Sequence, residues 1–130
     1  MKNTNLSFKH ISIYSGPENS PGYLLWRVNA YWKSSIEKVL KTLDLTHPQF
    51  VVLATTGWLT RENSPTNQIT ISQTAGLDPN TTSQILRSLE KKKLIKRVHS
   101  IDERAKSPML TAAGKLILSK AVPAVERADE

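Results

Sequence analysis

Cysteine is absent from the 130 residues of this chain. Its absence excludes disulfide bonds, thiolate metal sites, cysteine nucleophiles and thiol-based redox sensing. Long apolar runs are also absent, since none approaches the roughly 18 residues that a bilayer-spanning helix needs. The first residues lack the continuous apolar core of a secretory signal peptide. We therefore expect a cytoplasmic protein with no membrane partner.

The sequence also lacks the usual signatures of catalysis and metal binding. It contains no G-x-S-x-G, GxGxxG or P-loop pattern. Its three histidines, His10, His47 and His99, are far apart and have no partner three or four residues away. We therefore expect no metal site and no cofactor. The carboxylates near Asp102 stand beside Arg and Lys rather than among apolar residues, so we do not expect an enzyme.

Positive charge is abundant instead, with 18 Lys and Arg against 11 Asp and Glu and a net charge of +7. Eight basic and only three acidic residues lie between Arg87 and Lys106, so most of the excess falls in one short window. Such an excess favours a polyanionic partner, although many basic proteins never bind nucleic acid.

The length of 130 residues allows one domain with a substantial core but is too short for two. We expect residues 1–21 to form an N-terminal arm and residues 22–130 to form the domain. The arm is either mobile or docked on a partner subunit, and alternating apolar residues within residues 6–13 hint at a strand.

Two helices with apolar residues at helical spacing are predicted in the first half of the domain. The first covers residues 23–43. Leu24, Trp26 and Tyr31 lie off its main apolar stripe, which suggests a second buried face against a partner. The second helix, residues 46–59, begins with the capping-box sequence Thr-His-Pro-Gln.

The next segment predicts two helices joined by a tight turn and followed by a hairpin. Asn67 can cap a short helix, Gly76-Leu77 makes the turn, and Asp78-Pro79 supplies a cap and a first-turn proline for the second helix. Two short strands follow at residues 95–98 and 108–110. This order is typical of a winged helix-turn-helix, so the expected fold class is mainly α with a small β-hairpin.

The second of these helices presents a polar face that suits base reading. Amide side chains suit adenine, arginine suits guanine, and hydroxyls can serve a base or a phosphate. The alternative is a solvated polar face, which any surface helix shows. The residues predicted to approach bases are Asn80, Thr81, Ser83, Gln84 and Arg87. Those predicted to neutralise phosphates are Lys91, Lys96, Arg97 and Lys106. The opposite, inward side of the wheel holds Thr82, Ile85, Leu86, Leu89 and Lys93.

The turn between the two strands displays Arg104 and Lys106. A basic hairpin beside a recognition helix can place an arginine in the narrow, electronegative minor groove. Asp102 can hold the Arg104 guanidinium in a bidentate pair and so aim it. The alternative is an exposed ion pair that contributes little.

Together these segments resemble the MarR-type transcriptional regulators. The resemblance covers about residues 20–127. It rests on residues 77–95, on the D-x-R-A sequence that begins at Asp102, on the L-T-x-x-G sequence of residues 110–114, and on residues 20–26 and 45–50, which match one branch of the family.

The resemblance implies a dimeric protein with a winged helix-turn-helix DNA-binding lobe at about residues 46–111. Dimerisation helices are implied at about residues 22–43 and 111–130. Such a dimer places its recognition helices in successive major grooves of a pseudo-palindromic operator, with half-sites about one helical turn apart. Asp102 and Arg104 would form the pair at the tip of the wing.

The chain departs from the family pattern in two places. Lys93 stands where most relatives have glycine, which costs about 1 kcal/mol if the residue is left-handed, although lysine can add a phosphate contact. Relatives also continue beyond residues 121–126 into a last helix that helps dimerise. Here Thr111 is expected to cap a helix that Pro123 breaks or restarts, leaving about two turns for the final helix.

A possible effector pocket is suggested by aromatic residues, because small aromatic or phenolic ligands bind between the two parts of such regulators. The basic charge balance suits an anionic ligand. The alternative is that aromatic residues at helical spacing form ordinary core. The candidate pocket residues are Trp26, Tyr31, Trp32, His47, Phe50 and Trp58.

The sequence thus predicts a sequence-specific DNA-binding transcriptional regulator, a ligand-responsive repressor that binds double-stranded DNA as a homodimer. One alternative is a winged-helix protein-interaction module with weakened or lost DNA reading, whose basic wing binds an acidic partner. Another is architectural DNA binding without sequence preference.

Overall fold

The computed structural model of the chain describes residues 5–99 and 106–129. The predicted wing-tip pair, Asp102 and Arg104, lies outside the described residues. The chain divides into two compact units, Met1–Ser34 and Ser35–Glu130, and each is described by itself. Within the described ranges the elements are five α-helices, two short 3-10 helices and one antiparallel hairpin, which confirms the predicted fold class. None of the described helices combines the length and apolarity needed to traverse a bilayer.

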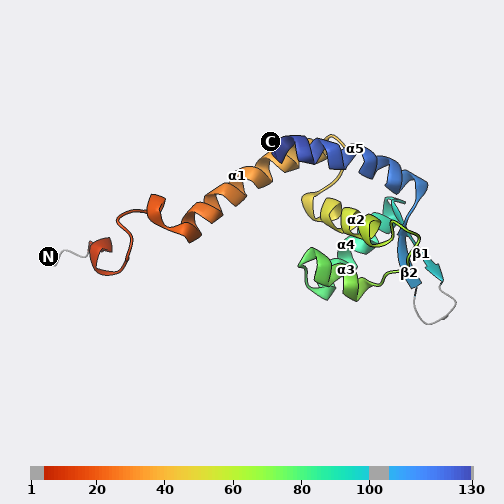
Figure 1. Cartoon of the computed structure of the whole chain (residues 1–130), viewed down its shortest axis with the longest axis horizontal. Coiled ribbons are helices and arrows are strands. Elements are labelled where there is room, and N and C mark those ends of the chain that lie inside the picture. Colours follow the sequence, from red (N-terminus) through yellow and green to blue (C-terminus); the bar gives the residue numbers. More distant parts are fainter. Residues whose placement is uncertain (1–4, 100–105, 130) are drawn as a thin grey trace. The chain divides into compact units, whose positions relative to one another are not determined.

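The first unit begins with two 3-10 helices, η1 (Phe8–His10) and η2 (Pro17–Asn19). It then enters α1 (Pro21–Lys41), as Figure 1 shows. The prediction of a strand within residues 6–13 is wrong. Residues 8–10 form a 3-10 helix, in which the Ile11 N–H donates to the Phe8 carbonyl at 3.2 Å. Alternating apolar residues form a strand only beside a second strand, and the one described sheet contains only the hairpin.

Only the second half of α1 is buried. Leu25 and Tyr31 in the first unit expose 71% and 80% of their surface, whereas Ile36 and Leu40 in the second unit expose none. The apolar stripe predicted for residues 23–43 therefore packs on its own domain only near its C-terminal end. Leu25 and Val28 of the stripe are exposed, and Trp32 is half-buried.

The second unit is built around α2 (His47–Leu59). This helix contacts α3 (Gln68–Ala75), α4 (Pro79–Lys91), α5 (Ala112–Asp129) and the strand β2 (Lys106–Leu110). β2 pairs antiparallel with β1 (Ile95–His99), with Ile95 opposite Leu110. Figure 1 shows α5 on one side of α2 and α3 with α4 on the other. The fully buried residues Val52, Leu53, Ile71, Leu86 and Leu89 form the centre of the core.

The predicted helix starts are confirmed in detail. Thr46 and Gln49 form the expected capping box at the start of α2. Asn67 Oδ1 accepts from the Thr70 N–H at 2.8 Å at the start of α3. Gly76 ends α3 with a φ of 70°, a left-handed conformation in which a glycine is favoured. These contacts are local, so a short stretch of sequence suffices to specify them.

Lys93, which replaces the glycine of most relatives, adopts a left-handed conformation with a φ of 61°. Its N–H donates to the Glu90 carbonyl at 2.9 Å, and the Leu94 N–H donates to the Leu89 carbonyl at 3.0 Å. This pair of bonds is the Schellman motif that ends a helix. The prediction that Lys93 lies on the inward side of the helix is wrong, because α4 ends at Lys91 and Lys93 is exposed.

Lys93→Gly is therefore expected to raise the free energy of unfolding by about 1 kcal/mol, because glycine adopts this backbone conformation without a Cβ penalty. Urea unfolding measures the change. Lys91→Gly is the matched control, since Lys91 has helical backbone in the last turn of α4. There the same replacement should lower stability by about 1 kcal/mol. Equal effects at both positions would contradict the backbone argument.

α5 differs from the prediction in its second half. Pro123 was expected to break or restart the helix, but α5 continues unbroken from Ala112 to Asp129. Proline removes one backbone N–H, and its ring here is exposed. Ala121 and Val125, on either side of it, are buried, so packing holds the helix on the core across the proline.

The start of α5 is hydrogen-bonded to the residues that follow α4. The Thr111 N–H donates to the Leu94 carbonyl at 3.0 Å, and the Thr111 hydroxyl donates to the Lys93 carbonyl at 2.7 Å. The same hydroxyl oxygen accepts from the Gly114 N–H at 3.0 Å, which confirms Thr111 as the cap. A Cβ on Gly114 would lie 2.1 Å from the Leu94 carbonyl oxygen. The L-T-x-x-G sequence thus has a packing role.

Candidate nucleic-acid interface

α4 separates its buried and exposed residues cleanly. Thr82, Leu86 and Leu89 are buried against the core. Ser83 is half-buried at the edge of the opposite face. That opposite face exposes Asn80, Gln84, Arg87 and Lys91. It thus offers amide, guanidinium and ammonium groups and no carboxylate, the composition expected of a helix that reads base edges beside phosphates.

The N-terminal turn of α4 is held by Asp78. The carboxylate accepts from the Thr81 N–H at 2.9 Å and from the Thr81 hydroxyl at 2.6 Å. These bonds, the hydroxyl bond first, hold the pKa of Asp78 below its usual value. The cap is therefore ionised at neutral pH, and its stabilising effect is lost only as the pH falls through the lowered pKa. Thr81 was predicted to approach bases, but its hydroxyl proton is donated to the Asp78 carboxylate.

The C-terminal turn of α4 is tied to its neighbours by side chains. Arg97 on β1 forms an ion pair with Glu90, with 2.7 Å between Nε and Oε1. The Nε of Arg97, predicted to neutralise phosphates, is thus occupied within the lobe. Ser88 accepts from Gln49 Nε2 at 3.1 Å, so the helix is also attached to α2. These contacts attach the C-terminal turn of α4 to α2 and β1, while its exposed face, from Asn80 to Lys91, stays open.

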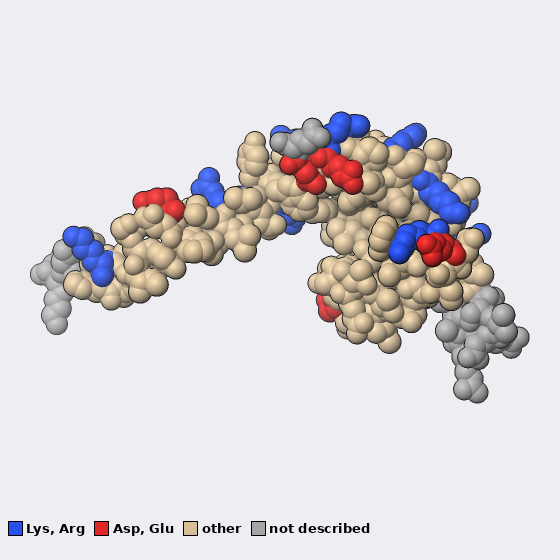
Figure 2. All heavy atoms as spheres, viewed as in Figure 1, with Lys and Arg blue, Asp and Glu red and all other residues tan. Residues whose placement is uncertain are grey.

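The wing adds basic residues beside α4. Lys96 on β1 is exposed and pairs in register with Met109. Lys106 lies in β2 opposite His99, and its side chain is outside the described residues, as are Asp102 and Arg104. Figure 2 shows Lys and Arg atoms over α5 and next to the hairpin on the face drawn. The roles assigned to Lys106, Asp102 and Arg104 stay predictions.

This arrangement matches known winged-helix proteins. The family model for ArnR1-like winged-helix domains matches residues 40–126. The uncharacterized HTH-type transcriptional regulator YdcH of Bacillus subtilis is 33% identical over 120 residues, which cover 92% of this chain and 82% of that protein. The crystal structure of the MarR family protein Rv2887 of Mycobacterium tuberculosis has a TM-score of 0.70 and 27% identity, and the match covers 86% of this chain and 78% of that one.

The chain belongs to the MarR-type winged helix-turn-helix transcriptional regulators. A further structural relative is CouR from Rhodococcus jostii bound to p-coumaroyl-CoA, with a TM-score of 0.79, 25% identity, and coverage of 88% of this chain and 79% of that one. YdcH and Rv2887 are HTH-type transcriptional regulators, and this chain is a DNA-binding transcriptional regulator of the same kind.

The six residues predicted for an effector pocket of this MarR-type regulator fall in different units. Trp26 and Tyr31 are exposed in the first unit, where Trp32 is half-buried. The second unit holds His47 and Phe50, both half-buried, and Trp58, which is 62% exposed. The Arg61 guanidinium lies 3.7 Å above the centre of the Trp58 ring, a cation–π contact. The pocket assigned to these six residues stays a prediction.

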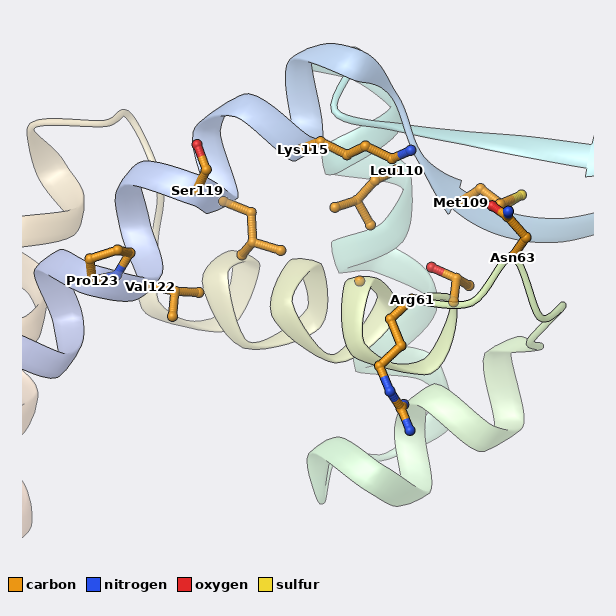
Figure 3. Close-up of a pocket in the computed structure, with 11 residues that line it drawn as sticks. Arg61, Asn63, Met109, Leu110, Lys115, Ser119, Val122 and Pro123 are labelled. Carbon is orange, nitrogen blue, oxygen red and sulfur yellow. The ribbon is translucent and has the colours of Figure 1, made fainter.

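A cavity of about 460 Å³ in the second unit is lined by a different set of residues. Figure 3 shows it between the C-terminal half of α2, the end of β2 and α5. The Lys115 side chain extends along its rim, whereas the Arg61 guanidinium points away from α5. The lining residues are Gly57, Thr60, Arg61, Asn63, Met109, Leu110, Lys115, Leu118, Ser119, Val122 and Pro123. They come from three separate segments, so no local sequence pattern marks them.

Proposed function

We propose that this regulator is a repressor that binds a pseudo-palindromic operator as a homodimer and is released by a small acidic ligand. The observation that carries the proposal is the exposed, carboxylate-free face of α4 over a buried apolar face. A repressor of this kind acts in the cytoplasm, where a bacterial chromosome lies.

The residues of the lobe take different roles on DNA. Asn80, Gln84 and Arg87 read base edges in the major groove, with Thr81 and Ser83 at the edge of the contact. Lys91 and Lys96 neutralise phosphates, and so does Arg97 through the guanidinium nitrogens that Glu90 does not hold. Arg104, aimed by Asp102, enters the minor groove, and Lys106 binds the adjoining backbone.

The exposed apolar residues of the first unit support the proposal of a homodimer. Leu25, Trp26, Val28 and Tyr31 on α1 each expose more than 60% of their surface, and Leu6, Phe8, Ile11 and Ile13 of the arm do the same. So much exposed apolar surface in one segment marks an interaction site. A symmetric dimer covers this surface and sets the spacing of the two recognition helices.

The cavity beside α5 is the candidate ligand site in the second unit. Leu110, Leu118 and Val122 give it an apolar wall, and Lys115 supplies a cation at the rim. That combination suits a small acid with an apolar body. The Mycobacterium tuberculosis relative Rv2887 has been crystallised with salicylic acid, at 28% identity to this chain and a TM-score of 0.65. The predicted aromatic residues remain a second candidate site for the same ligand class.

Selection of bound sites from a random duplex pool at near-physiological salt tests the proposal. A two-fold symmetric motif with half-sites about one helical turn apart supports a dimeric regulator. Salicylate, the probe acid, should then release the selected duplex. A lone half-site would contradict the dimer, and the absence of any enriched motif would favour the protein-interaction alternative.

A further inference from the structure

Gln49 joins the start of α2 to the last turn of α4. Its side-chain oxygen accepts from the Thr46 N–H at 3.1 Å and from Lys92 Nζ at 2.9 Å. Its side-chain nitrogen donates to the Ser88 hydroxyl at 3.1 Å. A carboxamide oxygen has two acceptor positions, so both are used here. One side chain thus combines a helix cap with two contacts to the recognition helix.

Lys92 extends this connection to the corner between α1 and α2. Its ammonium donates to the Asp44 carbonyl and lies 3.8 Å from Asp44 Oδ2. The Asp44 side chain is 97% exposed, so its carboxylate contributes little, whereas the Lys92 side chain is only 29% exposed. The bonds from Lys92 to the carbonyl and to the Gln49 amide are therefore the stronger ones, because they are charge-assisted and partly shielded from water.

The position of this clamp, defined as Gln49, Ser88, Lys92 and Asp44, matters for reading DNA. It holds the C-terminal turn of α4, whereas the exposed Asn80 lies in the first turn at the other end. The helix has 13 residues. A rotation of about 10° at the clamp moves its first turn by about 3 Å, since each residue adds roughly 1.5 Å of length. Such a displacement exceeds what a hydrogen bond to a base tolerates.

We propose that Gln49 and Lys92 are positioning residues of the recognition helix. Their bonds hold α4 at a fixed angle to α2. They also couple any movement of α4 to that of the α1–α2 corner. The inference rests on the proposed function. It adds that a movement of the α1–α2 corner alters the distance between the two recognition helices of the dimer. The clamp residues themselves read no base.

The test uses Gln49→Leu, which keeps the volume but removes all amide bonds, and Lys92→Met, which removes only the ammonium. Affinity is measured for the duplex selected by the wild-type chain and for versions with the half-site spacing changed by one base pair, each at several salt concentrations. Both variants should lose about fivefold or more on the selected duplex. They should also lose the preference for its spacing while the salt slope stays unchanged.

Three further variants sharpen the result. Gln49→Glu should retain most of the affinity and the spacing preference, because a carboxylate can serve the capping box and accept from Lys92. It loses only the bond to Ser88, whose hydroxyl donates to the Ile85 carbonyl at 2.7 Å. The double variant Gln49→Leu/Lys92→Met should be no weaker than either single variant, because the two residues act as one unit. Glu62→Gln changes an exposed side chain after α2, outside the clamp and outside the implied dimerisation helices, and should leave the spacing preference intact.

Two outcomes would overturn the inference. One is a folded Gln49→Leu variant with unchanged affinity and spacing preference. If that variant does not fold, Lys92→Met and Ser88→Ala, which removes only the hydroxyl contact, decide by the same measurements. The other is a Lys92→Met variant whose salt slope falls by about one unit with spacing preference intact, which would make Lys92 a phosphate contact. A wild-type chain that selects no duplex would overturn the proposed function itself.

Discussion

Arg87→Ala is expected to lower affinity for the selected operator by about 10- to 100-fold, the range for losing one bidentate contact to a base. Arg87 is exposed on the carboxylate-free face of α4, two turns from its start, whereas its neighbour Leu86 is fully buried. The change should also relax the sequence preference at one position in each half-site. Titration of the operator and of single-base variants at fixed salt measures both effects.

Lys96→Ala is the matched control for this prediction, because it also removes one exposed cation. Lys96 lies on β1 rather than on the recognition helix, and we assign it to a phosphate. Its loss should weaken binding to all duplexes about equally and reduce the salt slope by about one unit. An Arg87→Ala variant with the same uniform loss would show that Arg87 contacts the backbone instead of a base.

Gly114→Ala is expected to lower the free energy of unfolding by about 1–3 kcal/mol or more, the range for forced overpacking. In an ordinary helix the same change would be stabilising by roughly 1 kcal/mol. Here the new Cβ would lie 2.1 Å from the Leu94 carbonyl oxygen, which also accepts the Thr111 N–H. Relief of the clash therefore requires the end of the recognition helix and the start of α5 to separate. Urea unfolding of the DNA-free protein measures the loss.

Gly57→Ala provides a graded control within the same unit. Its Cβ would lie 2.8 Å from Leu118 Cδ2, the flexible end of a side chain that can rotate away. We therefore expect a clearly smaller loss of stability than at Gly114. A Gly114→Ala variant as stable as the wild-type chain would mean that α5 approaches Leu94 less closely than the structure shows.

The sequence predicted most accurately those features that depend on a few adjacent residues. The Thr46 capping box, the Asp78 cap with Pro79 behind it and the turn at Gly76 all form as local contacts. The hairpin was also predicted, from two short segments on either side of a charged turn, and the polar face of α4 was predicted from helical periodicity. The fold class and the regulator family could be inferred from these features together.

The sequence was misleading where a local pattern depends on what lies beside it. Residues 6–13 alternate like a strand but have no partner strand among the described residues, so they form a 3-10 turn instead. Pro123 is a helix breaker in isolation, yet α5 passes through it because Ala121 and Val125 are buried on both sides. The apolar stripe of α1 is periodic along its whole length but is buried only at its C-terminal end.

The sequence by itself determined which helices form, where they begin, and which side of α4 is polar, because capping and periodicity act over one or two turns. Only the tertiary structure decided how α4 is held. The contacts of Gln49 with Ser88 and Lys92 span 39 and 43 positions of the chain. The approach of Gly114 to Leu94 likewise joins residues of different elements. Such contacts form only after packing brings distant segments together, so no local pattern encodes them.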